Sequence, residues 1–159
     1  MSGQSIERLV ANQWAEHLDA DDEEVLGFWK RAVESFSDST APRLSRTGQF
    51  KQLYDAARQG VVAFAAAHGY RAKGAAGQHQ HIFAAGAALA PDELKDAING
   101  LQIQRSIRHD LEYGTQRSVS EEEISDLRRA VCELLNELAS EIRRIRPGLL
   151  KRVKKLKCP

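Results

Sequence analysis

The sequence predicts an all-α protein, folded as a single antiparallel bundle of five to six helices. Apolar residues recur three and four positions apart through most of the chain, which is the period of a helix with one buried face. No segment alternates apolar and polar residues over the length of a strand, so no sheet is expected. The connections between helical segments are short, and short connections make consecutive helices antiparallel.

The helix expected over residues 120–145 has the clearest boundaries. Ser120 and Glu123 have the spacing of a capping box, and Val119 and Ile124 have that of a hydrophobic staple. Acidic residues fill the first turn and basic residues the last, an arrangement that complements the helix dipole. A Pro-Gly pair then ends the helix.

Five further helices are expected before it, from apolar stripes, capping residues and helix breakers. Gly69 is expected to end the third of them in a left-handed conformation. A loop is expected from Lys73 to Gly77 because two glycines flank small residues. The expected helices cover Ile6–Leu18, a segment from Asp21 to Ser39, Thr47–His68, Gln78–Leu89, and a segment to Tyr113 with Pro91 in its first turn.

Length and composition predict a single domain, and the distribution of charge sets off its acidic start and its basic C-terminal tail. The chain has 159 residues, a net charge of +1, and 42% hydrophobic residues, all ordinary for a single globular domain. Acidic residues gather over 16–24 and basic residues over 143–157, an asymmetry typical of an acidic end and a basic tail. We expect an N-terminal helix over 1–20, a bundle over 21–146 and a basic tail over 147–159. The tail, with Lys154 and Lys155, is interpreted either as a nucleic-acid contact or as a frayed, solvated end.

The cysteines and apolar runs indicate a cytoplasmic protein without a membrane segment. Cys132 and Cys158 form no CxxC motif and no disulfide framework, so a reducing compartment is expected. No apolar run of signal-peptide length lies in Met1–Val10, and no stretch approaches 18 apolar residues. Phosphate-binding loops, dinucleotide fingerprints and zinc spacings are missing, so neither a cofactor nor a metal is expected.

A polar segment near the end of the fifth helix carries the candidate chemistry. Arg105, Arg108, His109 and Glu112 are separated by steps of three and four, so they share one helix face. One interpretation is a solvated face with an Arg108–Glu112 ion pair. The other is an RNA-binding face, because arginines hold phosphate and histidine moves protons near neutral pH. A symmetric dimer would supply the further groups that such a site needs.

Two histidines, His79 and His81, stand at the start of the short fourth helix. They are candidate polar partners of the same site, or parts of an anion site at the helix entry. Positions two apart point away from each other on a helix, which argues against a shared metal.

Several segments, taken in their order along the chain, carry a family resemblance. They are VLGFWKRA at 25–32, FKQLYDAA at 50–57, HGYR at 68–71, QHQH at 78–81 and RSIRHDLEY at 105–113. Over roughly residues 21–145, this order resembles the HEPN superfamily of small helical bundles. That resemblance implies a HEPN-like fold, a homodimer, and an activity as a metal-independent ribonuclease. Such proteins are often toxins paired with a small nucleotidyltransferase antitoxin.

The family motif is an arginine, usually followed by a polar residue, and then a histidine four to six intervening residues later. Arg108 and His109 match the first two places, and Tyr113 stands where the histidine belongs. Tyrosine ionises near pH 10 and is a poor base at neutral pH. The first hypothesis is therefore a module that binds RNA, a nucleotide or a partner protein, with His79, His81, Glu112, Lys154 and Lys155 as binding residues.

Two alternatives stay open. One is an active ribonuclease toxin in which Arg105, Arg108, His109 and Tyr113 are catalytic. The other is a purely structural helical adaptor, whose acidic segment and basic tail are docking surfaces.

Overall fold

The computed structural model describes residues 4–74, 78–114 and 118–159, and within them it contains six α-helices and one two-stranded sheet. The all-α bundle of five to six helices is confirmed, whereas the expectation of no sheet is wrong. The elements are α1 (Ile6–Ala11), β1 (Ala15–His17), α2 (Asp22–Asp38), α3 (Arg46–Ala67), β2 (Tyr70–Ala72), α4 (Gln78–Leu89), α5 (Asp92–Tyr113), α6 (Glu121–Ile145) and a 3-10 turn (Pro147–Leu149).

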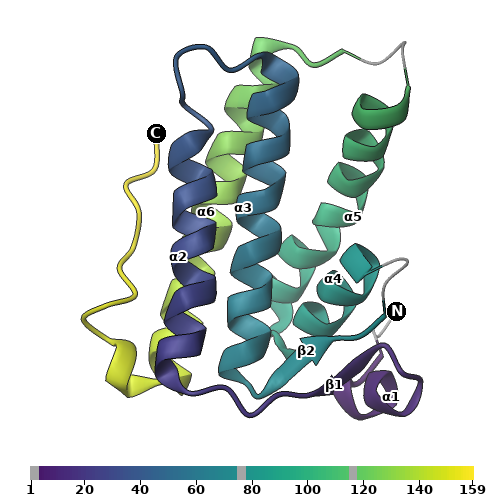
Figure 1. Cartoon of the computed structure of the whole chain (residues 1–159), viewed down its shortest axis with the longest axis vertical. Helices are drawn as coiled ribbons and strands as arrows, with labels where there is room; N and C mark the ends of the chain where they lie inside the picture. The colour runs from purple at the N-terminus through teal and green to yellow at the C-terminus, as the bar shows by residue number, and fades with distance from the viewer. Residues whose placement is uncertain (1–3, 75–77, 115–117) are drawn as a thin grey trace.

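The long helices are arranged around α3 (Figure 1). Helices α2 and α6 pack against one side of α3, α4 and α5 against the other, and α1 and the sheet lie at one end. The four longest helices, α2, α3, α5 and α6, alternate in direction, which makes the bundle antiparallel (Figure 1). In the part of the chain that the structure describes, every helix is too short or too polar to cross a bilayer.

Helix α3 forms the centre of the core and combines small with large buried side chains. Ala57 has no exposed surface, and Tyr54 and Phe64 are among the largest fully buried side chains. A Cβ atom on Gly60 would lie 2.6 Å from Leu135 Cδ2, so α6 packs directly onto the backbone of α3. Apolar residues from the neighbouring helices complete the core around α3.

The first helix is shorter than expected, since the Ile6–Leu18 segment stays helical only to Ala11. Gln13 has a φ of 66°, a left-handed conformation that reverses the chain after the helix. The residues that follow form β1, in which Glu16 lies opposite Arg71 of β2. Strands of three residues are too short to show a period of two, which is why the sequence pattern does not reveal them.

The expected helix boundaries are otherwise largely correct. The capping box of α6 is present: Glu123 N donates to Ser120 Oγ at 3.0 Å, and Ser120 N donates to Glu123 Oε1 at 3.2 Å. Gly69 has the expected left-handed φ of 87°. Pro91 is the N-cap of α5 rather than a first-turn residue. Of the expected loop at 73–77, residues 75–77 lie outside the described residues.

The basic tail is not frayed, so that interpretation is wrong. Leu149 and Val153 are fully buried and belong to the main core. Arg146, at the end of α6, donates to Ala67 O at 3.0 Å, to Ala20 O at 2.9 Å and to Asp22 Oδ1 at 3.0 Å. One guanidinium therefore joins the end of α6, the end of α3 and the start of α2 before the tail begins.

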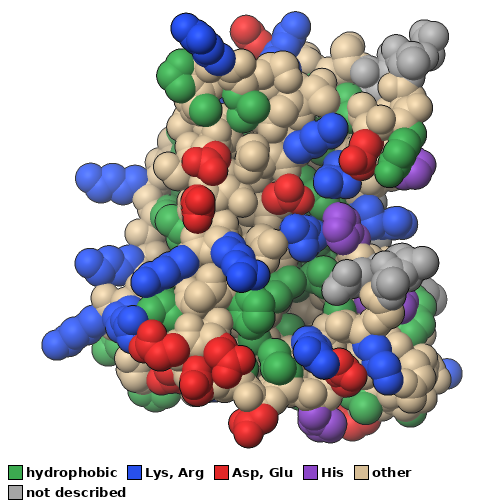
Figure 2. Space-filling model, in the orientation of Figure 1, with side chains coloured by type: hydrophobic (Ala, Val, Ile, Leu, Met, Phe, Trp, Pro, Cys, Tyr) green, Lys and Arg blue, Asp and Glu red, His purple; other side chains and the backbone are tan. Residues whose placement is uncertain are grey.

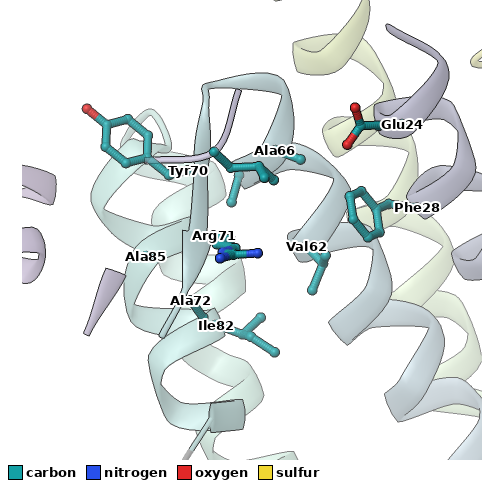
Figure 3. A pocket seen from close by; sticks show the side chains of 11 residues that line it. Glu24, Phe28, Val62, Ala66, Tyr70, Arg71, Ala72, Ile82 and Ala85 are labelled. Carbon is teal, nitrogen blue, oxygen red and sulfur yellow. The ribbon is translucent and has the colours of Figure 1, made fainter. Parts of the chain in front are cut away.

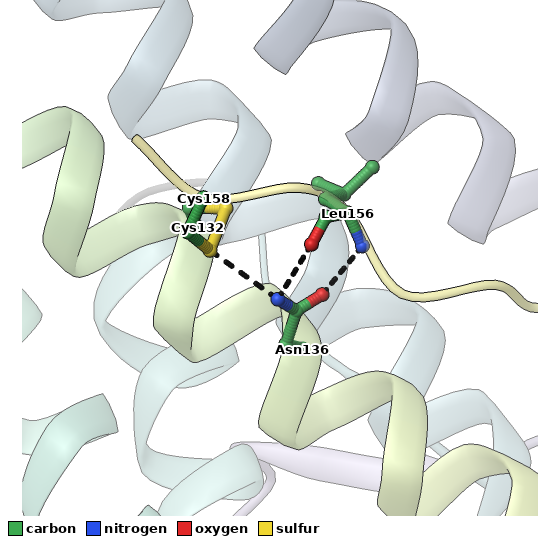
Figure 4. Close-up of a disulfide and its surroundings, with 4 residues drawn as sticks. All are labelled: Cys132, Asn136, Leu156 and Cys158. Carbon is green, nitrogen blue, oxygen red and sulfur yellow. Dashed lines mark hydrogen bonds between the residues drawn. A yellow bond between two sulfur atoms is a disulfide. The ribbon is translucent and has the colours of Figure 1, made fainter.

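The end of the tail is held against α6 by a disulfide and an amide (Figure 4). Cys132 and Cys158 are joined by an S–S bond of 2.11 Å, so the expectation that the chain has no disulfide framework is wrong. The Asn136 amide donates to Leu156 O at 2.9 Å and accepts from Leu156 N at 2.6 Å. The tail turns back along α6, and this reversal brings together two cysteines that lie 26 residues apart.

Breaking this disulfide should destabilise the fold without abolishing it. Closing a loop of this length restricts the unfolded chain and contributes about 3 kcal/mol. We expect Cys158→Ser to lower the thermal midpoint by about 10 °C in calorimetry. A dithiol reductant should lower the midpoint of the native chain by the same amount and leave that of the variant unchanged. Equal midpoints for the native chain with and without reductant would contradict this role.

Candidate functional site

Polar side chains from α3, α4 and α5 meet around the hydroxyl of Tyr54. Tyr54 lies in the apolar stripe of α3 and has no exposed surface. Its hydroxyl lies 3.2 Å from Nδ1 of His79, the second residue of α4. The phenol ring also meets Phe83 edge-on, with a centroid distance of 5.8 Å. Core packing thus fixes the phenol, and the phenol in turn positions the imidazole.

Arginines surround this pair. The Arg108 guanidinium lies over the Tyr54 ring, 5.4 Å from its centroid, and its Nε is 4.0 Å from Asp55 Oδ1. Arg58 contacts the same Asp55 oxygen at 3.5 Å. Arg108 also donates to Glu112 Oε2 at 3.0 Å. We call this group the Tyr54 cluster; its members are Tyr54, Asp55, Arg58, His79, Arg105, Arg108 and Glu112.

The Tyr54 cluster is cationic, and its two titratable rings are neutral. Burial raises the pKa of Tyr54 to about 12, although Arg108, Arg58 and Arg105 act in the opposite direction. Burial lowers the pKa of His79, and the charges of Arg58 and Arg108 lower it further. At neutral pH the phenol therefore keeps its proton and the imidazole carries no charge. The cluster's three guanidiniums outnumber its two carboxylates.

The two other predicted catalytic residues lie at the outer end of α5. His109 and Tyr113 pack against each other, with ring centroids 4.9 Å apart. His109 is exposed, and Tyr113 is 72% exposed. Arg105 and Arg108 instead turn toward α3, where both act on the pKa values of Tyr54 and His79. The structure thus brings together the predicted arginines, Glu112 and His79, but not the His109–Tyr113 pair.

His81 points away from His79, as the two-residue spacing predicts. Its Nδ1 hydrogen-bonds to Lys73 O, and its ring stacks on Trp14 at a centroid distance of 4.2 Å. This contact fastens the segment after α1 to α4. Within the described residues, no group of three or more histidine, cysteine or acidic side chains is arranged to hold a metal.

The predicted tail lysines are far from the Tyr54 cluster. Lys154 and Lys155 are exposed on the tail beside α2, whereas α5 lies at the opposite edge of the bundle (Figure 1). In Figure 2, basic and acidic side chains intermix beside a histidine on the right of the molecule, over α3 and α5. These two surfaces do not form one continuous basic patch.

Sequence reasoning missed the members of the cluster that α3 supplies. The apolar spacing of the third expected helix places Tyr54 among its core residues, and no motif in the sequence points to Asp55 or Arg58. A tyrosine within an otherwise apolar stripe is itself a signal, because a buried hydroxyl needs a hydrogen-bond partner. Its partner, His79, is 25 residues away, so the spacing within one helix does not reveal it.

A separate apolar hollow lies between α2, α3, β2 and α4 (Figure 3). It encloses about 290 Å³ and is lined by Phe28, Val62 and Ile82, among others. Arg71 and Glu24 lie on different sides of it, and Arg71 is ion-paired with Glu16. None of the residues predicted from the sequence as catalytic or ligand-binding lines this hollow.

The Tyr54 cluster has the chemistry of an anion site. Guanidinium groups bind phosphate through paired hydrogen bonds, and α3 and α5 supply them from two sides. A neutral imidazole is able to accept a proton, and its contact with a hydroxyl of high pKa fixes its orientation. The half-buried setting strengthens these charges relative to a fully solvated helix face.

Comparison with protein-family models, with curated proteins and with solved structures found no match to this chain.

His79 should titrate below its ordinary pKa of 6.5, because burial and the charges of three arginines disfavour its protonated form. The folded state then binds fewer protons than the unfolded state, so His79 reduces stability as the pH falls from about 6.5 through the folded pKa. Above about pH 6.5, His79 adds no pH dependence to the free energy of unfolding. We expect Arg108→Ala to raise the pKa of His79, measured by NMR of the imidazole ring.

His68 is a matched internal control for this titration. Burial also lowers its pKa, but the arginine that acts on it is Arg144. Its titration should be the same in the Arg108→Ala variant and in the native chain. A native His79 pKa at or above 6.5 would refute the assignment of a neutral imidazole.

Proposed function

We propose that this protein is a helical RNA-binding module that holds a backbone phosphate at the Tyr54 cluster. One observation carries the proposal: Arg58, Arg105 and Arg108 come from two helices and converge on the neutral Tyr54–His79 pair. Arg108 is already oriented by the Tyr54 ring and two carboxylates, so little side-chain ordering would accompany binding.

The proposal retains the HEPN-like interpretation of the sequence. The all-α bundle agrees with the fold that this resemblance implies. A homodimer and a nucleotidyltransferase-type antitoxin partner remain proposals from the resemblance alone. The Cys132–Cys158 disulfide removes the cysteine-based reason for a cytoplasmic setting, because disulfides are rare in reducing compartments. The structural adaptor receives less support, because the acidic segment already pairs with the end of α6 through Asp22–Arg146 and with the tail through Glu23–Arg152.

A second candidate function, metal-independent RNA cleavage, is favoured by the position of His79. In the family motif a histidine provides proton transfer, and Tyr113 replaces it here. In the Tyr54 cluster, His79 would take that role by accepting the proton of a ribose 2′-hydroxyl as its oxygen attacks phosphorus. The 5′-oxygen would leave and take a proton from water, while the arginines stabilise the added charge on phosphate.

Arg108→Ala should weaken the binding of a single-stranded RNA about tenfold, measured by fluorescence anisotropy at fixed salt. Losing one phosphate contact should also make the dependence of log K on log salt shallower by about one unit. Arg129→Ala is the matched control, because Arg129 is an exposed arginine on α6, outside the cluster. Equal losses from both variants would mean that binding depends on overall charge alone.

RNA cleavage in EDTA separates the binding module from the ribonuclease. If the protein cleaves RNA, His79→Gln and Arg108→Ala should each reduce the rate at least a hundredfold, since each removes a group that acts in the transition state. His109→Gln should retain the rate. If the native chain binds RNA but neither it nor the variants cleave RNA, the ribonuclease hypothesis is rejected and the binding module is retained.

A further inference from the structure

Helices α5 and α6 leave a groove between them on the side away from the Tyr54 cluster. In Figure 1 the upper part of α5 leans away from the rest of the bundle. The hollow between the helices encloses about 320 Å³. At Gly100 on its wall, an added Cβ would meet no atom within 4 Å. Ala97 and Ala130, which also line it, are exposed although both are small apolar residues.

The floor of the groove is apolar. Leu101, Leu127, Val131 and Leu134 line it, and each is at most 6% exposed. Small side chains on the walls let another helix approach closely, because its bulky residues fit between them. A row of small wall residues above a leucine-rich floor is the form of surface that receives one face of an amphipathic helix.

The rim of the groove is acidic. Glu133 and Glu137 are exposed there, and a second hollow continues from Glu137 past Asp92 and Glu93. None of these four carboxylates forms an ion pair with another part of the chain that the structure describes. Glu141 of the second hollow is paired with Arg144 at 2.7 Å. The groove therefore presents unpaired negative charge beside an apolar floor.

We propose that the α5–α6 groove binds a basic amphipathic helix of a partner protein. Leucine or alanine side chains of that helix would cover the floor, and lysine or arginine side chains on its flanks would face the four carboxylates. The two hollows extend along α5 from Pro91 to Gln104, which corresponds to a partner helix of about 20 Å or roughly 14 residues. This interaction does not require the Tyr54 cluster.

The test uses a synthetic 16-residue helical peptide with a leucine–alanine stripe flanked by lysines, and binding is followed by fluorescence anisotropy. We expect saturable binding that weakens with salt, and at least tenfold weaker binding to the Glu133→Lys/Glu137→Lys variant. Glu34→Lys is the control, because Glu34 is an exposed glutamate on α2, outside the groove. A peptide with glutamate in place of lysine should not bind.

A second variant separates the groove from its charge. Ala130→Leu fills the groove at an exposed position and changes no charge, so it should also weaken binding while the thermal midpoint stays the same. In NMR spectra the peptide should shift the amides of Gly100 and Leu101. Equal binding by the native chain and both groove variants, or shifts confined to other surfaces, would overturn the proposal.

Discussion

The close packing of the Leu135 side chain of α6 on the backbone of α3 at Gly60 is the constraint on which the other packing depends. It is possible because Gly60 has no side chain that would hold Leu135 away. Because α3 is enclosed by its neighbours, the core holds this helix in place. The helix in turn fixes the positions of Tyr54, Asp55 and Arg58. Side chains on a helix that is surrounded by the core are held more precisely than side chains on a flexible loop.

Arg146 is the polar counterpart of this apolar contact. Its side chain caps the open carbonyl oxygens of Ala67 and Ala20 and pairs with Asp22, all at the same end of the bundle. Carbonyl groups at a helix end need partners, and a single guanidinium satisfies several at once. The chain leaves this point in a defined direction, so the tail is able to return along α6 to Asn136 and Cys132.

Local signals explain which parts of the fold the sequence predicts. The α6 capping box, the left-handed Gly69 and the apolar stripes depend on neighbours within a few residues, and each appears in the structure as expected. The β1–β2 pairing, the disulfide and the Tyr54–His79 contact join segments 25 or more residues apart. No period in the sequence encodes such distances. Spacing within one helix therefore predicts Arg108 as a site residue, but it does not predict that Tyr54, on another helix, lies beneath it.

Helix α5 is anchored unevenly along its length. Leu94, Ile98 and Leu101 are buried, whereas no described residue from 103 to 113 is. Both arginines that α5 supplies to the Tyr54 cluster therefore project from the half of the helix that the core holds less firmly, toward the enclosed helix α3. An anion bound between α5 and α3 would attract guanidinium groups from both helices and draw the outer half of α5 toward α3. The free energy of binding would then include the free energy of moving that half of the helix.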